Sequence, residues 1–273
     1  MIELFLQNWP FVAGLLATGV IAGVLAGLLG VGGGIVIVPV LFHIFTGLGV
    51  DEGVRMHLAV GTSLATIIPT SIRSLLSHAK RGAVDWDLLK AWAPGLLVGT
   101  LAGTWLAGMV SAVVLQAVFG GVALLVSLNM AFGKAIEREQ ALSPSATSNF
   151  GISGTIGVFS AMMGIGGGTL GVPVLTYLGK IPQRAVATAS GFGLIISIPG
   201  AIGFIVTGLN AANLPPASLG YVNAIGFGLI TPMTVLAAPL GVAFAHALPK
   251  QRLKQAFALF LAITAIRMLS DII

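Results

Sequence analysis

Two short glycine-rich segments are the residues of this chain whose types and spacing could do chemistry. The first reads LLGVGGGIVIVPVL from Leu28, and the second reads MMGIGGGTLGVPVL from Met162. Consecutive glycines interrupt a helix, because each costs about 1 kcal/mol relative to alanine and tolerates positive φ. A helix that restarts after such a break presents unpaired backbone N–H groups and a positive dipole end, which together can hold an anion. The two segments therefore predict a pair of anion-binding helix breaks.

Hydroxyl side chains follow each break and could donate hydrogen bonds to the same anion. Ser and Thr hydroxyls in helices also donate to the preceding turn, so both roles stay open for them. Close helix packing is the alternative for the glycines, and it is the role expected for Gly19, Gly23 and Gly27, which are spaced four residues apart. The predicted substrate-binding residues are Gly32, Gly33, Gly34, Thr62, Ser63, Gly166, Gly167, Gly168, Thr188 and Ser190.

The sequence has no pattern of residues that indicates catalysis. It has no cysteine, and its eight acidic residues fall at predicted helix ends, in loops or at the termini. Paired carboxylates, a Ser/His/Asp set and a metal-ligand cluster cannot be recognised, and a carboxylate proton relay has no residues to use. We therefore expect a protein that is not an enzyme and that uses no cofactor or metal.

The composition is typical of a protein embedded in a lipid bilayer. Of 273 residues, 56% are hydrophobic and only 8% are charged, and the mean hydropathy is +1.04. A soluble domain has roughly a quarter of its residues charged, whereas a membrane span needs about 20 mostly apolar residues. Charge-poor stretches of that length recur from Pro10 to the C-terminus. The net charge of +5 comes from small basic clusters between these stretches, so nucleic acid is not an expected partner.

The chain contains an internal repeat, and each half begins with one glycine break. The segments Gly30 to Leu41 and Gly164 to Leu175 align without gaps at an offset of 134, and eight of the twelve pairs are identical. The later parts of the halves align more weakly at an offset of 138. We expect a first transmembrane repeat at residues 1–133, a cytoplasmic linker at 134–148 and a second transmembrane repeat at 149–273.

The basic loops of one half match uncharged loops of the other, as inverted repeats require. SHAKRGAVDWD in the first half corresponds to TGLNAANLPPASLGYVN in the second, which has no Asp, Glu, Lys or Arg. If the second half is inverted, the positive-inside rule puts all the basic clusters in the cytoplasm and the N-terminus outside. A parallel duplication with drifting loop charges is the alternative. The clustered residues are Arg73, Lys80, Arg81, Lys90, Lys134, Arg138, Lys180, Arg184, Lys250, Arg252 and Lys254.

Each half is expected to contain one glycine-broken helical element followed by three transmembrane helices. The segments after the breaks are too short to cross about 30 Å as helices, so each broken element is predicted to be a hairpin or re-entrant pair. The fold class is therefore an all-α polytopic membrane protein with two inverted-topology repeats. The broken elements cover about residues 10–47 and 149–179, and the helices cover about 55–79, 88–109, 112–132, 184–208, 220–247 and 252–270.

Four stretches resemble the TauE/SafE family, also called the sulfite exporter or 4-toluene sulfonate uptake permease family. They read GLLGVGGGIVIVPVL, AVGTSLATIIPT, HAKRGAVDWD and, in the second half, GIGGGTLGVPVL. The resemblance covers almost the whole chain and implies a multi-span transporter in the bacterial cytoplasmic (inner) membrane for sulfite, sulfoacetate or other organosulfonates. The second half departs from the pattern at AVATAS, where an extra alanine makes the match at Thr188 and Ser190 less direct.

The expected function is a secondary transporter that exports a small sulfur-containing anion, sulfite or an organosulfonate, held by the two breaks near the membrane midplane. An anion that leaves a cell with a negative interior gains about 2.3 kcal/mol per charge per 100 mV, so export needs no coupling ion. The alternative is an uptake permease for sulfonates or another small anion, coupled to Na⁺ or H⁺. The expected partners are the anion and the lipid bilayer, and a homo-oligomer stays an open alternative.

Overall fold

The computed structural model is predominantly helical and describes residues 9–30, 32–132, 145–247 and 250–272. The predicted all-α polytopic class is confirmed. In the first half the helices are α2 (Trp9–Leu29), α3 (Gly34–Gly47), α4 (Glu52–Ala79), α5 (Trp86–Met109) and α6 (Ala112–Phe132). In the second half they are α7 (Ala146–Met163), α8 (Gly168–Tyr177), α9 (Pro182–Gly208), α10 (Ala224–Ala247) and α11 (Lys250–Ser270).

One predicted element is wrong at its start, because a short hairpin occupies residues assigned to a helix at about 220–247. The strands β1 (Ser218–Leu219) and β2 (Val222–Asn223) pair antiparallel, and α10 begins only after them. Gly220, with φ of +53°, allows the tight turn between the strands. Asn223 then caps α10 by accepting the backbone N–H of Gly226 at 2.9 Å. Most of the predicted linker 134–148 lies outside the described residues.

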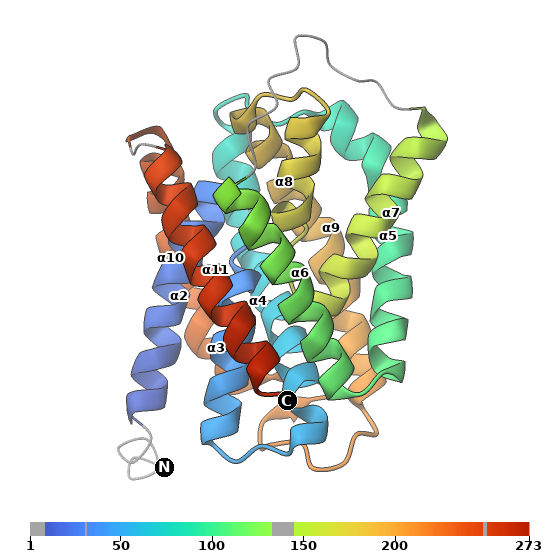
Figure 1. Cartoon of the computed structure of the whole chain (residues 1–273), viewed down its shortest axis with the longest axis vertical. Helices are drawn as coiled ribbons and strands as arrows, with labels where there is room; N and C mark the ends of the chain where they lie inside the picture. The colour runs from blue at the N-terminus through green and yellow to red at the C-terminus, as the bar shows by residue number, and fades with distance from the viewer. Residues whose placement is uncertain (1–8, 31, 133–144, 248–249, 273) are drawn as a thin grey trace.

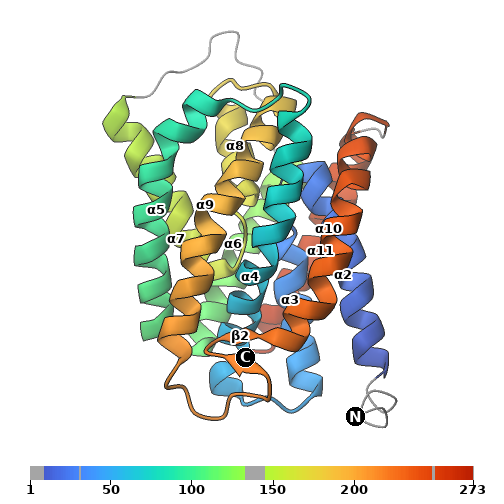
Figure 2. The ribbon, with the colours of Figure 1, turned by 180° about the vertical axis from the view of Figure 1, so that it is seen from behind.

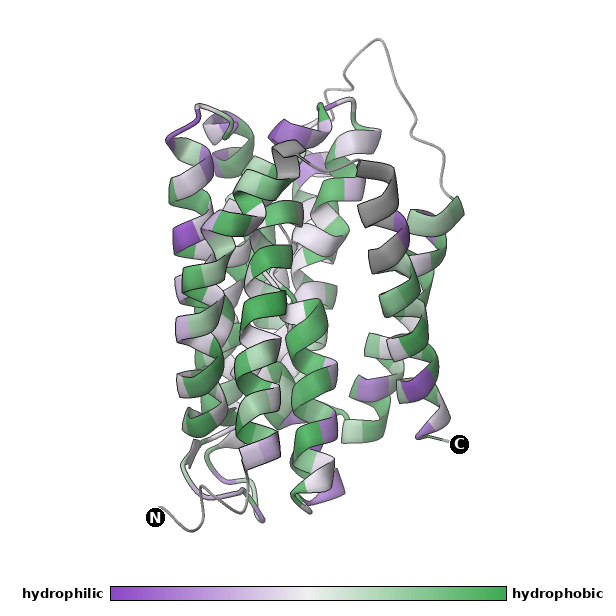
Figure 3. Cartoon of the chain, turned by 90° about the vertical axis from the view of Figure 1, so that its left-hand side faces the viewer, coloured by the Kyte–Doolittle hydropathy of each residue, from purple (hydrophilic) through white to green (hydrophobic). Residues whose placement is uncertain are grey.

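Five helices in the described parts of the chain are long and apolar enough to cross a bilayer. Figure 3 shows apolar residues along the middle of the helices and hydrophilic residues mostly toward their two ends. The helices α3 and α8 have 14 and 10 residues, which gives lengths of about 21 and 15 Å against a hydrocarbon core of about 30 Å. The five apolar spans are Trp9–Leu28, Glu52–Ala79, Ala112–Phe132, Pro182–Gly208 and Ala224–Phe244.

The two broken elements run in opposite directions (Figures 1 and 2). The helix α2 starts at the lower end of the molecule in Figure 1, and α3 returns to that end. The helix α7 starts at the opposite end, and α8 returns there. At this second end the α4–α5 and α8–α9 turns meet, with Lys180 Nζ 2.8 Å from Asp85 Oδ2. At the first end Asn213 Nδ2 donates to Asp51 Oδ2 at 3.3 Å, which joins the segment before the hairpin to the α3–α4 turn.

The four most extensive helix packings each join the two halves of the chain. They are α2 with α10, α5 with α7, α4 with α9, and α6 with α11. Glycines allow the close approach of α2 to α10, because a Cβ at Gly19 would lie 2.7 Å from the carbonyl oxygen of Ile230. Gly23 and Gly27 continue the same contact along the helix, so the predicted packing role of these three glycines is confirmed.

Candidate substrate pathway

Each break is built from glycines in the left-handed backbone region. Gly30, Gly32 and Gly33 have φ of +66°, +73° and +78°, and Gly164 and Gly167 have φ of +68° and +73°. Residues with a Cβ rarely adopt this conformation. Gly33 and Gly167 are the N-caps of α3 and α8 and provide no side-chain cap. The first N–H groups of both helices therefore depend on other partners.

The two breaks lie directly against each other, although they are far apart in sequence. A Cβ at Gly32 would be 3.4 Å from Gly166 Cα. A Cβ at Gly34 would be 3.0 Å from Ile165 Cα and would overlap the carbonyl oxygen of Gly164. From this meeting point α3 runs toward one end of the molecule and α8 toward the other (Figure 1). The structure thus brings together the glycine part of the predicted site, and all six predicted glycines are buried.

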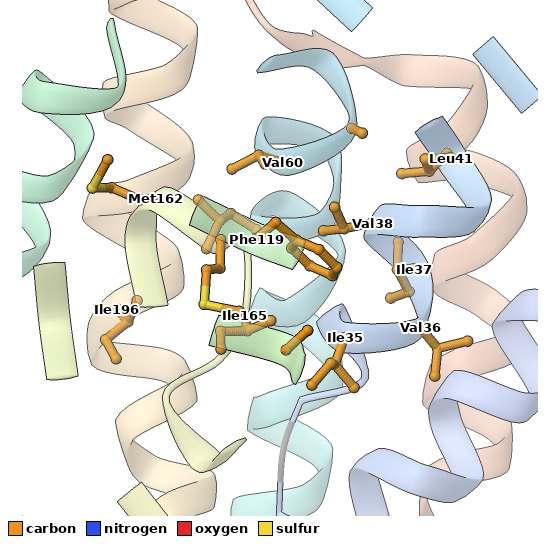
Figure 4. Close-up of a cluster of buried hydrophobic side chains, with 14 of the residues drawn as sticks. Ile35, Val36, Ile37, Val38, Leu41, Val60, Phe119, Met162, Ile165 and Ile196 are labelled. Atoms are coloured by element: carbon orange, nitrogen blue, oxygen red, sulfur yellow. The ribbon is translucent and has the colours of Figure 1, made fainter. Parts of the chain in front are cut away.

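Apolar side chains close the meeting point off from solvent. Figure 4 shows Ile35, Val38, Val60 and Ile165 gathered around Phe119 of α6. All five side chains are fully buried in the hydrophobic core. The glycine breaks therefore share a hydrocarbon environment in which any hydrogen bond or dipole interaction is strong, because water does not compete for it.

Ser63 contacts the breaks, whereas Ser190 is bonded within its own helix. Ser63 Oγ donates to the carbonyl oxygen of Gly164 at 2.8 Å, so α4 of the first half fixes the second break. Ser190 Oγ donates to the carbonyl oxygen of Ala187 at 2.6 Å. The second bond is the back-bonding to the preceding turn that was considered as an alternative.

Thr62 and Thr188 each bond to the start of a helix in the opposite half. Thr62 Oγ1 accepts the backbone N–H of Asn223 at 2.9 Å, and Thr188 Oγ1 accepts that of Asp85 at 3.0 Å. Both threonines are fully buried. These bonds tie α4 to the start of α10 and α9 to the start of α5. A role for either hydroxyl in anion binding stays a prediction.

An ion pair between Lys180 and Asp85 lies where the turns of the second end meet. The hydrogen bond from Lys180 Nζ holds the pKa of the Asp85 carboxyl below its ordinary value, with a smaller contribution from the backbone N–H of Leu88. The side chains of Asp85 and Lys180 are 16% and 33% exposed. Within the described chain, this ion pair connects α5 of the first half to the α8–α9 turn of the second.

A buried row of polar residues runs along α4, and only its first member, Thr62, was predicted from the sequence. Thr66 Oγ1 and Thr70 Oγ1 donate to carbonyl oxygens four residues earlier, at 2.8 and 2.9 Å. Thr70 Oγ1 also lies 2.7 Å from Thr234 Oγ1 of α10. The available signal was the spacing of four between these polar residues, because residues four apart lie on the same face of a helix. The row consists of Thr62, Thr66, Thr70, Ser74 and His78, all buried.

Comparisons with known proteins find a matching family model and similar chains named as membrane transporters. Residues 15–268 match the family model described as Sulfite exporter TauE/SafE. A probable membrane transporter protein of Haemophilus influenzae is 34% identical over 262 residues, which is 95% of this chain and 98% of the relative. A probable membrane transporter protein of Methanocaldococcus jannaschii is 31% identical over 233 residues, which is 83% of this chain and 81% of the relative. No solved structure matches the chain.

Proposed function

Because the chain belongs to the TauE/SafE family of membrane transporters, we propose that it exports a small sulfur-containing anion, sulfite or an organosulfonate, across the bacterial cytoplasmic membrane. The observation that carries the proposal is the contact of Gly32 and Gly34 with Gly164 to Gly166 of the other half. Two helix N-termini start from this point, and each stabilises an anion by about 0.3 to 2 kcal/mol. Such weak binding suits a carrier, which must also release its substrate.

The proposal includes an inverted arrangement of the two halves around the breaks. The opposite directions of the α2–α3 and α7–α8 elements support it (Figures 1 and 2). So do the matched packings of α2 with α10 and of α5 with α7. In transporters built from inverted repeats, broken helices hold the substrate near the bilayer midplane. The end that carries Lys80, Arg81 and Lys180 faces the cytoplasm under the positive-inside rule, and the N-terminus is outside.

Export is the direction that the charge distribution supports. The acidic residues of the described helices lie at N-caps or in first turns. Asp51 and Asp85 are N-caps, and Glu52 and Asp87 are in first turns. A carrier without an acidic residue inside its spans has no carboxylate to move a proton. The membrane potential itself drives a singly charged anion outward by about 2.3 kcal/mol per 100 mV.

A flux measurement in proteoliposomes tests the proposal. Purified protein is reconstituted, the vesicles are loaded with radiolabelled sulfite, and efflux is followed with and without an imposed inside-negative potential. Sulfate and methanesulfonate are added as competitors. We expect efflux that the potential accelerates and that at least one competitor slows. Folded protein that moves no sulfur anion would refute the proposal, and accumulation that depends on a Na⁺ or H⁺ gradient would favour coupled uptake instead.

A further inference from the structure

Three buried hydroxyls near the second break have no hydrogen-bond partner. They belong to Ser160 on α7, Thr169 in the first turn of α8 and Ser197 on α9. The residues are 0%, 4% and 0% exposed. A hydroxyl left unpaired inside a protein is costly, so buried polar groups without a partner point to a ligand that completes them.

Ser160 and Thr169 lie at the N-terminus of α8, and Ser197 lies on the face of α9 that contacts the second break. Ser160 Oγ is 3.8 Å from the position that a Cβ at Gly167, the N-cap of α8, would take. Thr169 is the second residue of α8. It lies in the first turn of this helix, whose backbone N–H groups have no partner within the helix. A Cβ at Gly193 would be 3.3 Å from the carbonyl oxygen of Gly166. Ser197 follows one turn later on the same face of α9.

The first break has hydrocarbon at the matching positions. The offset of 134 pairs Ser160 with Ala26 and Thr169 with Ile35, and the offset of 130 between Pro69 and Pro199 pairs Ser197 with Ile67. All three first-half residues are fully buried. The Ile67 side chain fills this break, with Cδ1 2.8 Å from the Cβ position of Gly34 and Cγ2 3.1 Å from that of Gly32.

On the basis of the proposed anion transport, we propose that the second break alone supplies side-chain donors. Ser160, Thr169 and Ser197, together with the N-terminus of α8, form an oxyanion site, and the first break forms its apolar wall. The two breaks are alike in backbone conformation and differ in the chemistry of the side chains that line them.

Because the donors of this site are neutral, they favour a ligand of low charge. Three hydroxyls and the backbone N–H groups of a helix turn are neutral, and they offer several hydrogen bonds to one small group. The cost of desolvating an ion rises steeply with its charge, and a neutral site offers no cation to offset it. The site therefore favours a singly charged oxyanion with several acceptor oxygens, such as an organosulfonate or hydrogensulfite, over doubly charged sulfate.

Matched substitutions at Thr169 and Ile35 test the site. Both residues are changed to Val, so that the two first turns carry the same side chain and only one variant loses a hydroxyl. Equilibrium binding of radiolabelled methanesulfonate to the purified proteins is measured together with flux in proteoliposomes. We expect Thr169→Val to weaken binding about tenfold, as for loss of a hydrogen bond to a charged group, and Ile35→Val to change it by less than about twofold. Sulfate should compete at least about tenfold less well than methanesulfonate.

The possible results separate a failure of the one-sided site from a failure of the proposed anion transport. Equal weakening by the two Val variants would overturn the one-sided site while leaving anion transport in place. If Thr169→Val does not fold, Ser160→Ala serves instead, and unchanged binding in that folded variant would overturn the site. Sulfate that competes as well as methanesulfonate would overturn the preference for a single charge. Wild-type protein that neither binds nor moves any sulfur anion would refute both proposals.

Discussion

The backbone N–H of Asn223 donates to the hydroxyl of Thr62 at 2.9 Å, and the backbone N–H of Asp85 donates to that of Thr188 at 3.0 Å. Asp85 and Asn223 are 138 residues apart, the offset at which the later parts of the halves align. Each also caps the helix that follows it: Asp85 Oδ1 accepts the N–H of Leu88 at 3.1 Å, and Asn223 Oδ1 accepts that of Gly226 at 2.9 Å. The same arrangement of hydrogen bonds between the two halves therefore occurs twice.

Removing either threonine hydroxyl should lower the free energy of unfolding by more than it weakens the free energy of anion binding. Thr62→Val and Thr188→Val each leave a backbone N–H without its partner, and we expect a loss of about 1 to 3 kcal/mol in the free energy of unfolding. Thermal unfolding in detergent, followed by circular dichroism, measures the change. Thr62→Ser and Thr188→Ser keep the hydroxyl and should restore most of the stability. A Val variant of normal stability that has lost anion binding would assign the hydroxyl to the substrate instead.

The ion pair between Asp85 and Lys180 should make stability depend on acidic pH. Because the pKa of Asp85 is lowered in the folded protein, its stabilising effect is present above the ordinary Asp pKa of about 3.9. This effect is lost as the pH falls through the depressed value. Since both side chains are partly exposed, the effect should not exceed about 1 kcal/mol.

Asp85→Asn is the matched variant for this prediction, since Asn caps the corresponding helix at Asn223. We expect the stability advantage of the wild type over Asp85→Asn to be full above about pH 5 and to decrease as the pH falls below the ordinary Asp pKa of about 3.9 and through the lowered pKa of Asp85. The unfolding temperatures of the two proteins over this range give the result. A constant difference between them would show that the ion pair contributes no pH-dependent stability.

Alanine at Gly33 should be more harmful than alanine at Gly82, although both glycines have positive φ. At Gly82, with φ of +64°, an added Cβ meets nothing within 4 Å, so only the conformational cost of about 1 to 2 kcal/mol applies. At Gly33, with φ of +78°, it would lie 2.8 Å from the carbonyl oxygen of Ala22, which adds about 1 to 3 kcal/mol of overpacking. Unfolding midpoints of the two variants test the difference. Equal losses would mean that the break can shift to accept a side chain.

The small-residue contact between α2 and α10 should be sensitive to a single methyl group. A Cβ at Gly27 would overlap the carbonyl oxygen of Ala238 and lie 2.9 Å from the backbone nitrogen of Val242. Gly27→Ala should therefore destabilise the protein by about 1 to 3 kcal/mol. Gly121→Ala, in α6, is the control, because its Cβ meets nothing within 4 Å and alanine favours the helix by about 1 kcal/mol. If both variants were equally stable, the close packing would not be essential.

Most of the helices could be predicted because membrane spans leave a strong local signal. The predicted helices at about 88–109 and 112–132 correspond to α5 (Trp86–Met109) and α6 (Ala112–Phe132). The hairpin at Ser218–Asn223 could not be predicted, because two-residue strands have no periodicity and the turn depends on the φ of Gly220.

The candidate site was predictable in its backbone and not in its side chains. Glycine clusters identify the breaks, since little else tolerates their positive φ. The threonines and serines near them have the same local sequence whether they bond to a neighbouring turn, to another helix or to a ligand. For that reason Ser63 and Ser190, predicted together, have different partners, and Ser160 and Ser197 were not considered.

The sequence by itself determined that the chain is a helical membrane protein with a duplicated glycine break, because span length, charge scarcity and glycine runs are properties of neighbouring residues. Only the tertiary structure decided that Gly32 lies against Gly166, and that each half packs mainly against the other. Contacts between residues far apart in the chain depend on how whole helix surfaces fit together. That fit comes from steric complementarity, which no local stretch of sequence contains.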